Sequence, residues 1–186
     1  MVEKINKLNG TRTYLVGGME MCKDNGVGWR DMITPKLQQL GVVVLNPCKK
    51  PVDGHVESLD SKAIFAKKKQ EGDYDYVAKE MREIRCIDLR MVDVTDFIVA
   101  HINLNTFIFG SVEEIVTAVR QKKPVLCMIE QGKQNTPNWL LGTIPHQHCF
   151  GSWDELFNYL KGVNDGSDTN TYKRWVFFKD LKNENS

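Results

Sequence analysis

The sequence predicts an α/β fold: a doubly wound, mostly parallel five-stranded sheet of the flavodoxin or Rossmann-like kind. Short, continuously apolar runs alternate along the chain with segments whose apolar residues recur at helical spacing. Strands without polar alternation belong to parallel sheets that are covered on both faces. The length of 186 residues suits one domain, which we expect at residues 1–163, followed by a polar tail over 164–186.

The first predicted strand, residues 13–16, is the β-rich run TYLV, and it ends in a tight turn at Gly17 and Gly18. A helix is predicted over residues 26–40, because large apolar residues recur there at helical spacing. Pro35 lies inside this segment and indicates either a kink or a later start of the helix.

A second buried strand is predicted at residues 42–45, and Asn46 and Pro47 stop it. Residues 48–72 are polar, rich in Lys and Asp, and without a clean period. We expect a long loop there, with or without a short helix around residues 62–69. A loop of this length inside a compact domain is usually a functional lid or a disordered excursion.

The middle of the chain contains two further helix–strand units. Residues 73–90 carry the apolar stripe of a helix, and residues 97–102 (FIVAHI) form the third strand. A helix over 111–121 is expected to begin with Ser111 as its N-cap, which places acidic residues in a first turn that favours negative charge. Residues 124–129 (PVLCMI) form the fourth strand.

The last elements are shorter. One helical turn is predicted at 137–142, a fifth strand at 148–150, and a final amphipathic helix capped by Ser152. The tail is polar apart from residues 175–178 (WVFF), which we expect either to pack back on the domain or to meet another subunit.

Charge and composition exclude several classes of function. With 25 basic and 24 acidic residues, the chain lacks the basic excess of a protein that binds nucleic-acid polymers. No apolar run reaches the roughly 18 residues of a membrane span, and the polar N-terminus lacks the apolar stretch of a signal peptide, so we expect a cytoplasmic protein.

Metal and cofactor motifs are also weak. Five cysteines occur without a CxxC pair, and the HxH of His146 and His148 has no obvious third ligand nearby. We therefore expect no metal and no cofactor.

Ligands of doubly wound sheets bind at the carboxyl ends of the strands, so the strand-to-helix loops should contain the site. Gly17 and Gly18 follow the first strand, where two glycines let a ligand approach the backbone or simply form a tight turn. Their spacing does not match GxGxxG and therefore does not indicate a dinucleotide.

Two carboxylates stand out near these loops. Glu114 follows Gly110 and Ser111 at the start of a predicted helix, where it could point into the cleft and attack an anomeric carbon. From position alone, a helix-dipole glutamate on a solvated face is the commoner explanation. Asp88 ends the helix predicted at 73–90, and an acid at a helix C-terminus is unfavourable for the dipole, which indicates a role other than stability.

Seven short motifs occur in order: Tyr14-Leu15-Val16-Gly17-Gly18, Trp29-Arg30, Leu40-Gly41, Asn46-Pro47, Asp88-Leu89, Gly110-Ser111-x-x-Glu114 and Asn138-Trp139-Leu140-Leu141. In this order and spacing they resemble the nucleoside 2-deoxyribosyltransferases and their N-glycosidase relatives, over roughly residues 13–160. The strongest part is the ungapped block from Asp88 to Glu114.

The resemblance implies a role for each matching residue. Glu114 would be the nucleophile that forms a glycosyl-enzyme ester, Tyr14 would hydrogen-bond and orient it, and Asp88 would hold the sugar hydroxyl side. Asn138 would reach the 5′-hydroxyl in a neighbouring subunit's site, which implies a homo-oligomer, a dimer or larger, with shared active sites. Relatives that act on 5′-monophosphates tend to carry serine there, so asparagine favours free nucleosides.

Further substrate contacts are expected from residues in the same loops and motifs: Gly17, Gly18, Asn46, Gly110 and Ser111.

The chain departs from the family where the leaving base is handled. The transferases carry an acid two positions before the motif glycine, but here that residue is Ile108, and Asn103 and Asn105 replace other acids of the loop. A leaving base must be protonated, and a general acid contributes typically 10²–10⁴-fold. Other sources of the proton would be acids of the polar segment, or the neighbour of the nucleophile: Asp53, His55, Glu57 or Glu113.

Three hypotheses follow for a nucleoside or nucleotide partner. The first is an enzyme that transfers the sugar to a second, free base. The second is a hydrolase that uses the same residues and releases the sugar to water. The third is a non-catalytic nucleotide-binding module.

Overall fold

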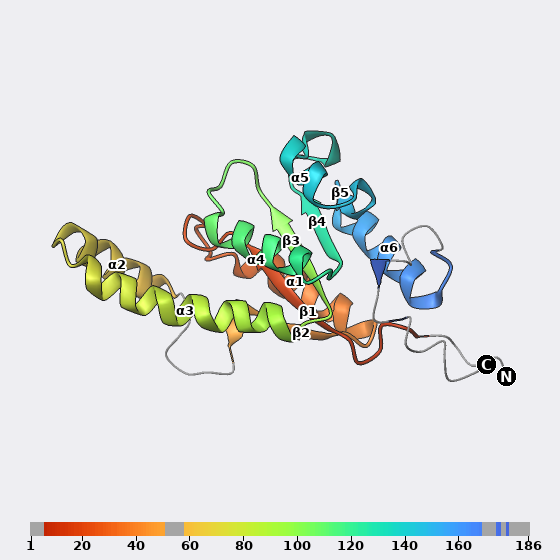
Figure 1. Cartoon of the computed structure of the whole chain (residues 1–186), viewed down its shortest axis with the longest axis horizontal. Coiled ribbons are helices and arrows are strands. Elements are labelled where there is room, and N and C mark those ends of the chain that lie inside the picture. Colours follow the sequence, from red (N-terminus) through yellow and green to blue (C-terminus); the bar gives the residue numbers. More distant parts are fainter. Residues whose placement is uncertain (1–5, 51–57, 169–173, 176–177, 179–186) are drawn as a thin grey trace.

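The computed structural model describes residues 6–50, 58–168, 174–175 and 178, and it contains the predicted five-stranded sheet (Figure 1). All strand pairs are parallel, and the strand order is β2-β1-β3-β4-β5. The strands are β1 (Arg12–Gly17), β2 (Val43–Leu45), β3 (Phe97–Ile102), β4 (Val125–Ile129) and β5 (Cys149–Phe150). The doubly wound α/β prediction is confirmed.

The helices connect the strands in the predicted sequence of elements. They are α1 (Val27–Gln39), η1 (Pro47–Lys49), α2 (Leu59–Gln70), α3 (Tyr74–Val94), α4 (Phe109–Arg120), η2 (Lys133–Asn135), α5 (Asn138–Thr143), η3 (His146–His148) and α6 (Trp153–Asp165). No helix in the described ranges is both long and apolar enough to cross a membrane.

The sheet separates two apolar cores. On one face, α1 and α6 pack against side chains such as Leu15 of β1. On the other face, α3 and α4 pack against side chains such as Val16 of the same strand. Because side chains alternate along a strand, Tyr14 belongs to the α3/α4 face. Its strand β1 lies inside the sheet, between β2 and β3.

The apolar part of the tail packs back on the domain. Trp175 and Phe178 are buried in the α1/α6 core, and the two rings are stacked with centroids 5.6 Å apart. For the cluster WVFF we expected packing either on the domain or on another subunit. Trp175 and Phe178 pack on the domain of their own chain. Val176 and Phe177 lie outside the described residues.

The segment predicted as a long loop or lid, residues 48–72, contains a 12-residue helix, α2. The short-helix alternative was right, but the helix is longer and begins at Leu59. None of the residues of α2 is buried, which fits the lack of an apolar stripe in its sequence. The helix begins at a capping box formed by Ser58 and Ser61. Residues 51–57 lie outside the described part.

The helix predicted over 26–40 is confirmed, whereas two other predicted helix boundaries are wrong. Helix α1 begins at Val27 and includes Pro35, so the late start is excluded. Helix α3 continues to Val94, and Asp88 therefore lies inside it and not at its C-terminus. Helix α4 begins at Phe109, and its N-cap is Ile108 and not Ser111. The buried residues Met91 and Val92 extend α3 beyond its predicted end at Arg90. The two residues that α4 gains before Ser111 are not buried, and packing does not explain its earlier start.

The end of the domain agrees more closely with prediction. The Oγ of Ser152 accepts a hydrogen bond from the Glu155 backbone N–H at 3.2 Å and caps α6. One turn of helix is present as α5, and β5 is a short strand.

Candidate active site

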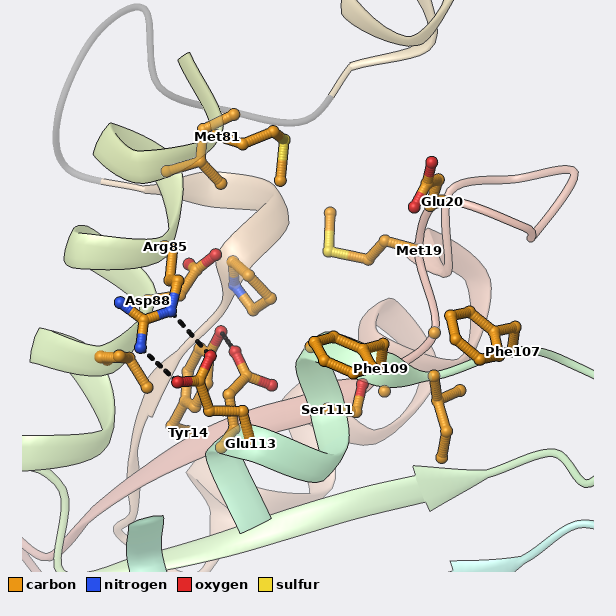
Figure 2. A pocket seen from close by; sticks show the side chains of 18 of the residues that line it. Tyr14, Met19, Glu20, Met81, Arg85, Asp88, Phe107, Phe109, Ser111 and Glu113 are labelled. Atoms are coloured by element: carbon orange, nitrogen blue, oxygen red, sulfur yellow. Dashed lines mark hydrogen bonds and ion pairs between the residues drawn. The ribbon is translucent and has the colours of Figure 1, made fainter. Parts of the chain in front are cut away.

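A cavity of about 450 Å³ lies at the carboxyl ends of β1 and β3, between the β1–α1 loop, α3 and α4 (Figure 2). Parallel α/β sheets bind their ligands at this edge. Seven of the nine predicted site residues line it: Tyr14, Gly17, Gly18, Asp88, Gly110, Ser111 and Glu114. The fold thus brings together residues that are up to a hundred positions apart in the chain.

The centre of the site is a hydrogen bond between Tyr14 and Glu114. Tyr14 Oη donates to Glu114 Oε1 at 2.8 Å, joining the inner strand β1 to helix α4. Tyr14 is only 1% exposed, so its ring cannot swing away, and its hydroxyl fixes the orientation of the carboxylate. Burial, followed by the negative charges of Glu114 and Asp88, raises the pKa of Tyr14 well above its usual value, so Tyr14 remains a proton donor.

Glu114 has an unusual acidity. Removal from water raises the pKa of Glu114 from 4.5 to about 8, against the hydrogen bond from Tyr14, which favours the charged form. A nearby negative charge at Asp88 adds to the rise, and the cations Arg30 and Lys50 oppose it. A solvated helix-face glutamate would show none of these contacts, so that alternative does not describe Glu114.

Asp88 lies on α3 at the same wall of the cavity and is paired with a buried lysine. Lys50 Nζ lies 2.8 Å from Asp88 Oδ1, and the side chains are 1% and 17% exposed, respectively. Burial raises the pKa of Asp88, and Lys50 opposes the rise. Sequence reasoning gave Lys50 no role, because the polar segment around it contains several equivalent lysines.

Arg30 holds the turn at the end of β1. Its guanidinium is buried and donates to the carbonyl oxygens of Leu15, Gly17 and Gly26 at 3.3, 2.9 and 2.8 Å. Burial lowers the pKa of Arg30. A rigid cation at the base of the cavity therefore supports both the turn and the charged form of Glu114.

Packing requires glycine at position 17 and leaves little room for a side chain at Gly18. A Cβ at Gly17 would lie 2.8 Å from the Trp29 ring, and one at Gly18 would lie 3.2 Å from the side chain of Thr106. Both glycines also line the cavity. Close packing at the end of β1 thus accounts for Gly17, and the backbone beside the cavity remains accessible to a ligand.

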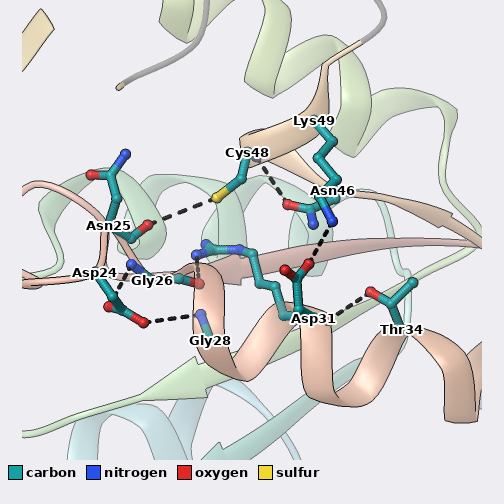
Figure 3. A network of polar contacts seen from close by, with 10 residues as sticks. Asp24, Asn25, Gly26, Gly28, Asp31, Thr34, Asn46, Cys48 and Lys49 are labelled. Atoms are coloured by element: carbon teal, nitrogen blue, oxygen red, sulfur yellow. Dashed lines mark hydrogen bonds and ion pairs between the residues drawn. The ribbon is translucent and has the colours of Figure 1, made fainter. Parts of the chain in front are cut away.

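Asn46 and Asn138 do not reach the cavity. Asn46 Oδ1 accepts a hydrogen bond from the Cys48 backbone N–H at 2.9 Å and caps η1 (Figure 3). Asn138 is exposed at the start of α5. Asn46 is therefore a structural cap, and Asn138 lies outside the lining of the cavity of its own chain.

The part of the cavity near position 108 is apolar and aromatic. Phe107 and Phe109 are 72% and 75% exposed, with ring centroids 6.2 Å apart and an interplanar angle of 18°. Ile108 lines the cavity between them, and Met19 and Met81 contribute thioethers (Figure 2). These side chains offer stacking and apolar contact to a flat ring.

Besides Asp88 and Glu114, two further acids line this cavity, namely Glu113 and Glu20. Glu113 forms a two-bond ion pair with Arg85, in which Arg85 Nε donates to Glu113 Oε2 at 2.8 Å. Both carboxylate oxygens of Glu113 are therefore engaged by Arg85. Glu20, on the β1–α1 loop, was missed by sequence reasoning and lies 3.7 Å from Lys69 of α2. The other proposed proton sources, Asp53, His55 and Glu57, lie outside the described residues.

The described part of the chain contains no group of three or more His, Cys, Asp or Glu side chains placed to hold a metal ion. Of the HxH pair, His148 Nε2 lies 3.0 Å from Tyr159 Oη. The ionisable side chains that line the cavity are carboxylates, the phenol of Tyr14 and arginine guanidinium groups.

Solved structures share this fold. A 2-deoxyribosyltransferase from the psychrotolerant bacterium Bacillus psychrosaccharolyticus, described as a biocatalyst for the synthesis of nucleosides, matches with a TM-score of 0.56 and 17% identity, over 80% of this chain and 92% of that chain. This chain has the fold of a 2-deoxyribosyltransferase. The match agrees, at the level of the fold, with the resemblance seen in the sequence motifs.

A 2-desoxiribosyltransferase from Leishmania mexicana matches with a TM-score of 0.43 and 18% identity, over 64% of this chain and 65% of that chain. No protein-family model and no curated protein matches the chain. Because one fold hosts many activities, the function has to be argued from the cavity itself.

Proposed function

We propose that the chain is an N-glycosidic enzyme of the 2-deoxyribosyltransferase type that transfers the sugar of a nucleoside from one base to another. The observation that carries the proposal is the 2.8 Å hydrogen bond from Tyr14 to Glu114 at the wall of the cavity. A carboxylate held by a buried donor, beside a second carboxylate, is suited to attack an anomeric carbon.

The reaction has two steps. A Glu114 carboxylate oxygen attacks C1′ of the nucleoside, a C–O ester bond forms, and the C–N bond breaks with its electron pair leaving on the base, which takes up a proton. In the second step, a nitrogen of the acceptor base attacks C1′, the ester bond breaks, and the base nitrogen loses its proton. Glu114 is regenerated as the carboxylate.

Only the ionised form of Glu114 can act as the nucleophile. With a pKa of about 8, about a tenth of Glu114 is charged at pH 7. Tyr14 and the cations Arg30 and Lys50 favour that fraction. A desolvated carboxylate is also more reactive than one in water, so the same burial that limits its amount favours its attack.

The substrate has a defined orientation under this proposal. The sugar lies against Tyr14, Asp88 and Glu114, with a hydroxyl donating to Asp88. The base lies toward Phe109, Met19 and Met81, where stacking on apolar surface replaces the hydrogen bond that an acid at position 108 would have made.

The test is incubation of the enzyme with a deoxynucleoside and a second free base. Transfer yields a new nucleoside, and the Glu114→Gln variant should lose at least roughly 10³-fold in rate, because the covalent step is removed. Acid quenching during turnover, followed by intact-mass measurement, should show one sugar attached to the wild-type chain and none to the variant.

Other outcomes of this incubation would overturn the transferase proposal. Free sugar without a new nucleoside would indicate a hydrolase, for which Ile108 in place of the acid is the relevant observation. Substrate binding without turnover, unaffected by Glu114→Gln, would indicate a non-catalytic nucleotide-binding module.

We further propose that the enzyme is a homo-oligomer whose sites are completed by Asn138 of a second copy. The exposed position of Asn138, outside the cavity of its own chain, supports this arrangement. Mixing the inactive Glu114→Gln variant with an impaired Asn138→Ala variant should restore part of the activity, because some mixed sites contain both native residues. A monomer by light scattering, or mixtures as inactive as their parts, would contradict it.

A further inference from the structure

Lys50 is a buried cation whose only part in the mechanism above is to favour the charged form of Glu114. Its side chain is 1% exposed and its Nζ lies 2.8 Å from Asp88 Oδ1. In every other lysine or arginine ion pair of the described residues, both side chains are at least 33% exposed. The pair between Lys50 and Asp88 is therefore different in kind from the surface pairs.

Fold stability is a poor explanation for such a pair. Taking two charges out of water offsets most of their attraction, so buried ion pairs are often replaceable by apolar residues without loss of stability. Surface alternatives were available, since the neighbouring Lys49 pairs with Asp31 at 2.7 Å on an exposed face. A role at the cavity, where Asp88 forms part of the wall, explains the burial better.

The geometry links four side chains from four parts of the fold. Lys50, after η1, contacts Asp88 of α3, and Tyr14 of β1 hydrogen-bonds Glu114 of α4. Tyr14 also interacts with Asp88 and favours its charged form. Tyr14 has a single hydroxyl proton to donate, and the contact between Lys50 and Asp88 leaves that proton for Glu114.

We propose that Lys50 is a positioning residue that keeps Asp88 charged and oriented, so that Asp88 accepts a hydrogen bond from a sugar hydroxyl while Tyr14 donates to Glu114. This inference rests on the proposed function and adds a residue that acts through Asp88. Lys50 does not line the cavity, so it is not expected to touch the substrate.

The other charges around Asp88 cannot replace Lys50. Arg30 of α1 favours the charged form of Asp88 from a distance, but its donors are engaged with backbone carbonyls. Arg85, one turn away on α3, is paired with Glu113. Without Lys50, burial would leave Asp88 protonated to higher pH.

The proposal predicts a pH-dependent loss of activity. In Lys50→Met, Asp88 takes up a proton at a higher pH than in the wild type, so kcat/KM should fall roughly 10- to 100-fold near neutral pH. The acid limb of the profile should move to higher pH, with the smallest loss at alkaline pH. Lys50→Arg should retain most of the activity, and the control Lys49→Met should resemble the wild type.

A double-mutant cycle with Asp88→Asn separates this role from a structural one. If Lys50 acts through Asp88, the Lys50→Met/Asp88→Asn enzyme should be no slower than Asp88→Asn alone. The double variant lacks both buried charges and is expected to fold even where Lys50→Met does not. A double variant slower by the product of the two single losses would overturn the proposal, as would a pH-independent loss in Lys50→Met.

The outcome is distinguishable from failure of the proposed function. If the wild type forms no new nucleoside and no free sugar, the enzyme assignment fails irrespective of Lys50. If the wild type is active and Glu114→Gln is not, but Lys50→Met keeps the wild-type rate and pH profile, only the role of Lys50 is refuted.

Discussion

At Glu114, burial and hydrogen bonding act in opposite directions, and burial dominates. Its pKa of about 8 in the folded state, against 4.5 as the ordinary value, means that ionisation is harder in the folded chain than in the unfolded chain. Folding stability should therefore fall as the pH rises from about 4.5 to 8. The ionised form of Glu114 that acts as the nucleophile therefore lowers the free energy of unfolding.

Glu114→Gln should consequently stabilise the protein at alkaline pH. Above pH 8 the wild type carries the full penalty of the buried charge, and its removal should raise the free energy of unfolding by on the order of a few kcal/mol. Near pH 4 the two proteins should be equal, since Glu114 is then protonated in both states. Urea denaturation at several pH values measures this.

Glu113→Gln provides a control, because the contribution of Glu113 to folding stability depends on pH in the opposite direction. The ion pair with Arg85 lowers the pKa of Glu113, so its stabilising effect is present above the ordinary pKa of a glutamate and is lost as the pH falls. A pH-independent difference between Glu114→Gln and the wild type would contradict the burial argument.

Tyr14→Phe isolates the hydrogen bond at the centre of the site. The phenol favours the charged form of Glu114, so its removal should raise the pKa of Glu114 further and reduce kcat roughly 10- to 100-fold. The acid limb of the pH–rate profile should move to higher pH. An unchanged profile with a lower rate would assign Tyr14 to packing alone.

At the scale of elements, the β1–α1 turn determines the shape of the cavity. Gly26 has a φ of +69°, which a residue with a Cβ rarely adopts, and a Cβ there would collide with Arg30 and with the Gly18 carbonyl. Asp24 completes the turn by accepting hydrogen bonds from the N–H groups of Gly26 and Gly28 at 3.0 and 2.9 Å (Figure 3).

Gly26→Ala should therefore destabilise the protein by about 1–3 kcal/mol. It should also reduce activity, because Arg30 would lose its place against the turn. Gly142→Ala in α5 is the matched control, since a Cβ at Gly142 meets nothing within 4 Å and should be neutral or slightly stabilising. Thermal unfolding of both variants measures the difference, and equal melting temperatures for Gly26→Ala and Gly142→Ala would refute the steric argument.

At the scale of the whole molecule, the two faces of the sheet have different tasks. The α3/α4 face provides the polar residues of the cavity, whereas the α1/α6 face is closed by Trp175 and Phe178 from the tail. Trp175 also donates from Nε1 to Tyr159 Oη at 2.9 Å. The tail beyond α6 is thus part of the core that supports the site from behind.

Trp175→Ala should lower the free energy of unfolding by about 3–5 kcal/mol, the usual effect of removing a buried aromatic side chain. Trp139→Ala, at a tryptophan that is 89% exposed, should change it by less than about 0.5 kcal/mol. Chemical denaturation of the isolated variants provides both values, and similar losses in the two would place Trp175 outside the core.

The sequence by itself determined the fold class, the order of the elements, and Tyr14, Asp88 and Glu114 as candidate site residues. These follow from local signals, namely apolar periodicity and short motifs. The end of α3 at Val94 and the exposed helix α2 escaped these signals, because packing decided the first and a capping box began the second. The start of α4 at Phe109 also escaped them, and neither burial nor a side-chain cap explains it.

Which of several similar residues meet depends on the folded arrangement of the chain. That arrangement selected Lys50 among the lysines of its segment as the partner of Asp88, removed Asn46 and Asn138 from the cavity, and placed Trp175 in the core. The pKa of Glu114 likewise depends on burial and on neighbours from four other elements or loops. Such contacts join residues far apart in the chain, and no local pattern of residues encodes them.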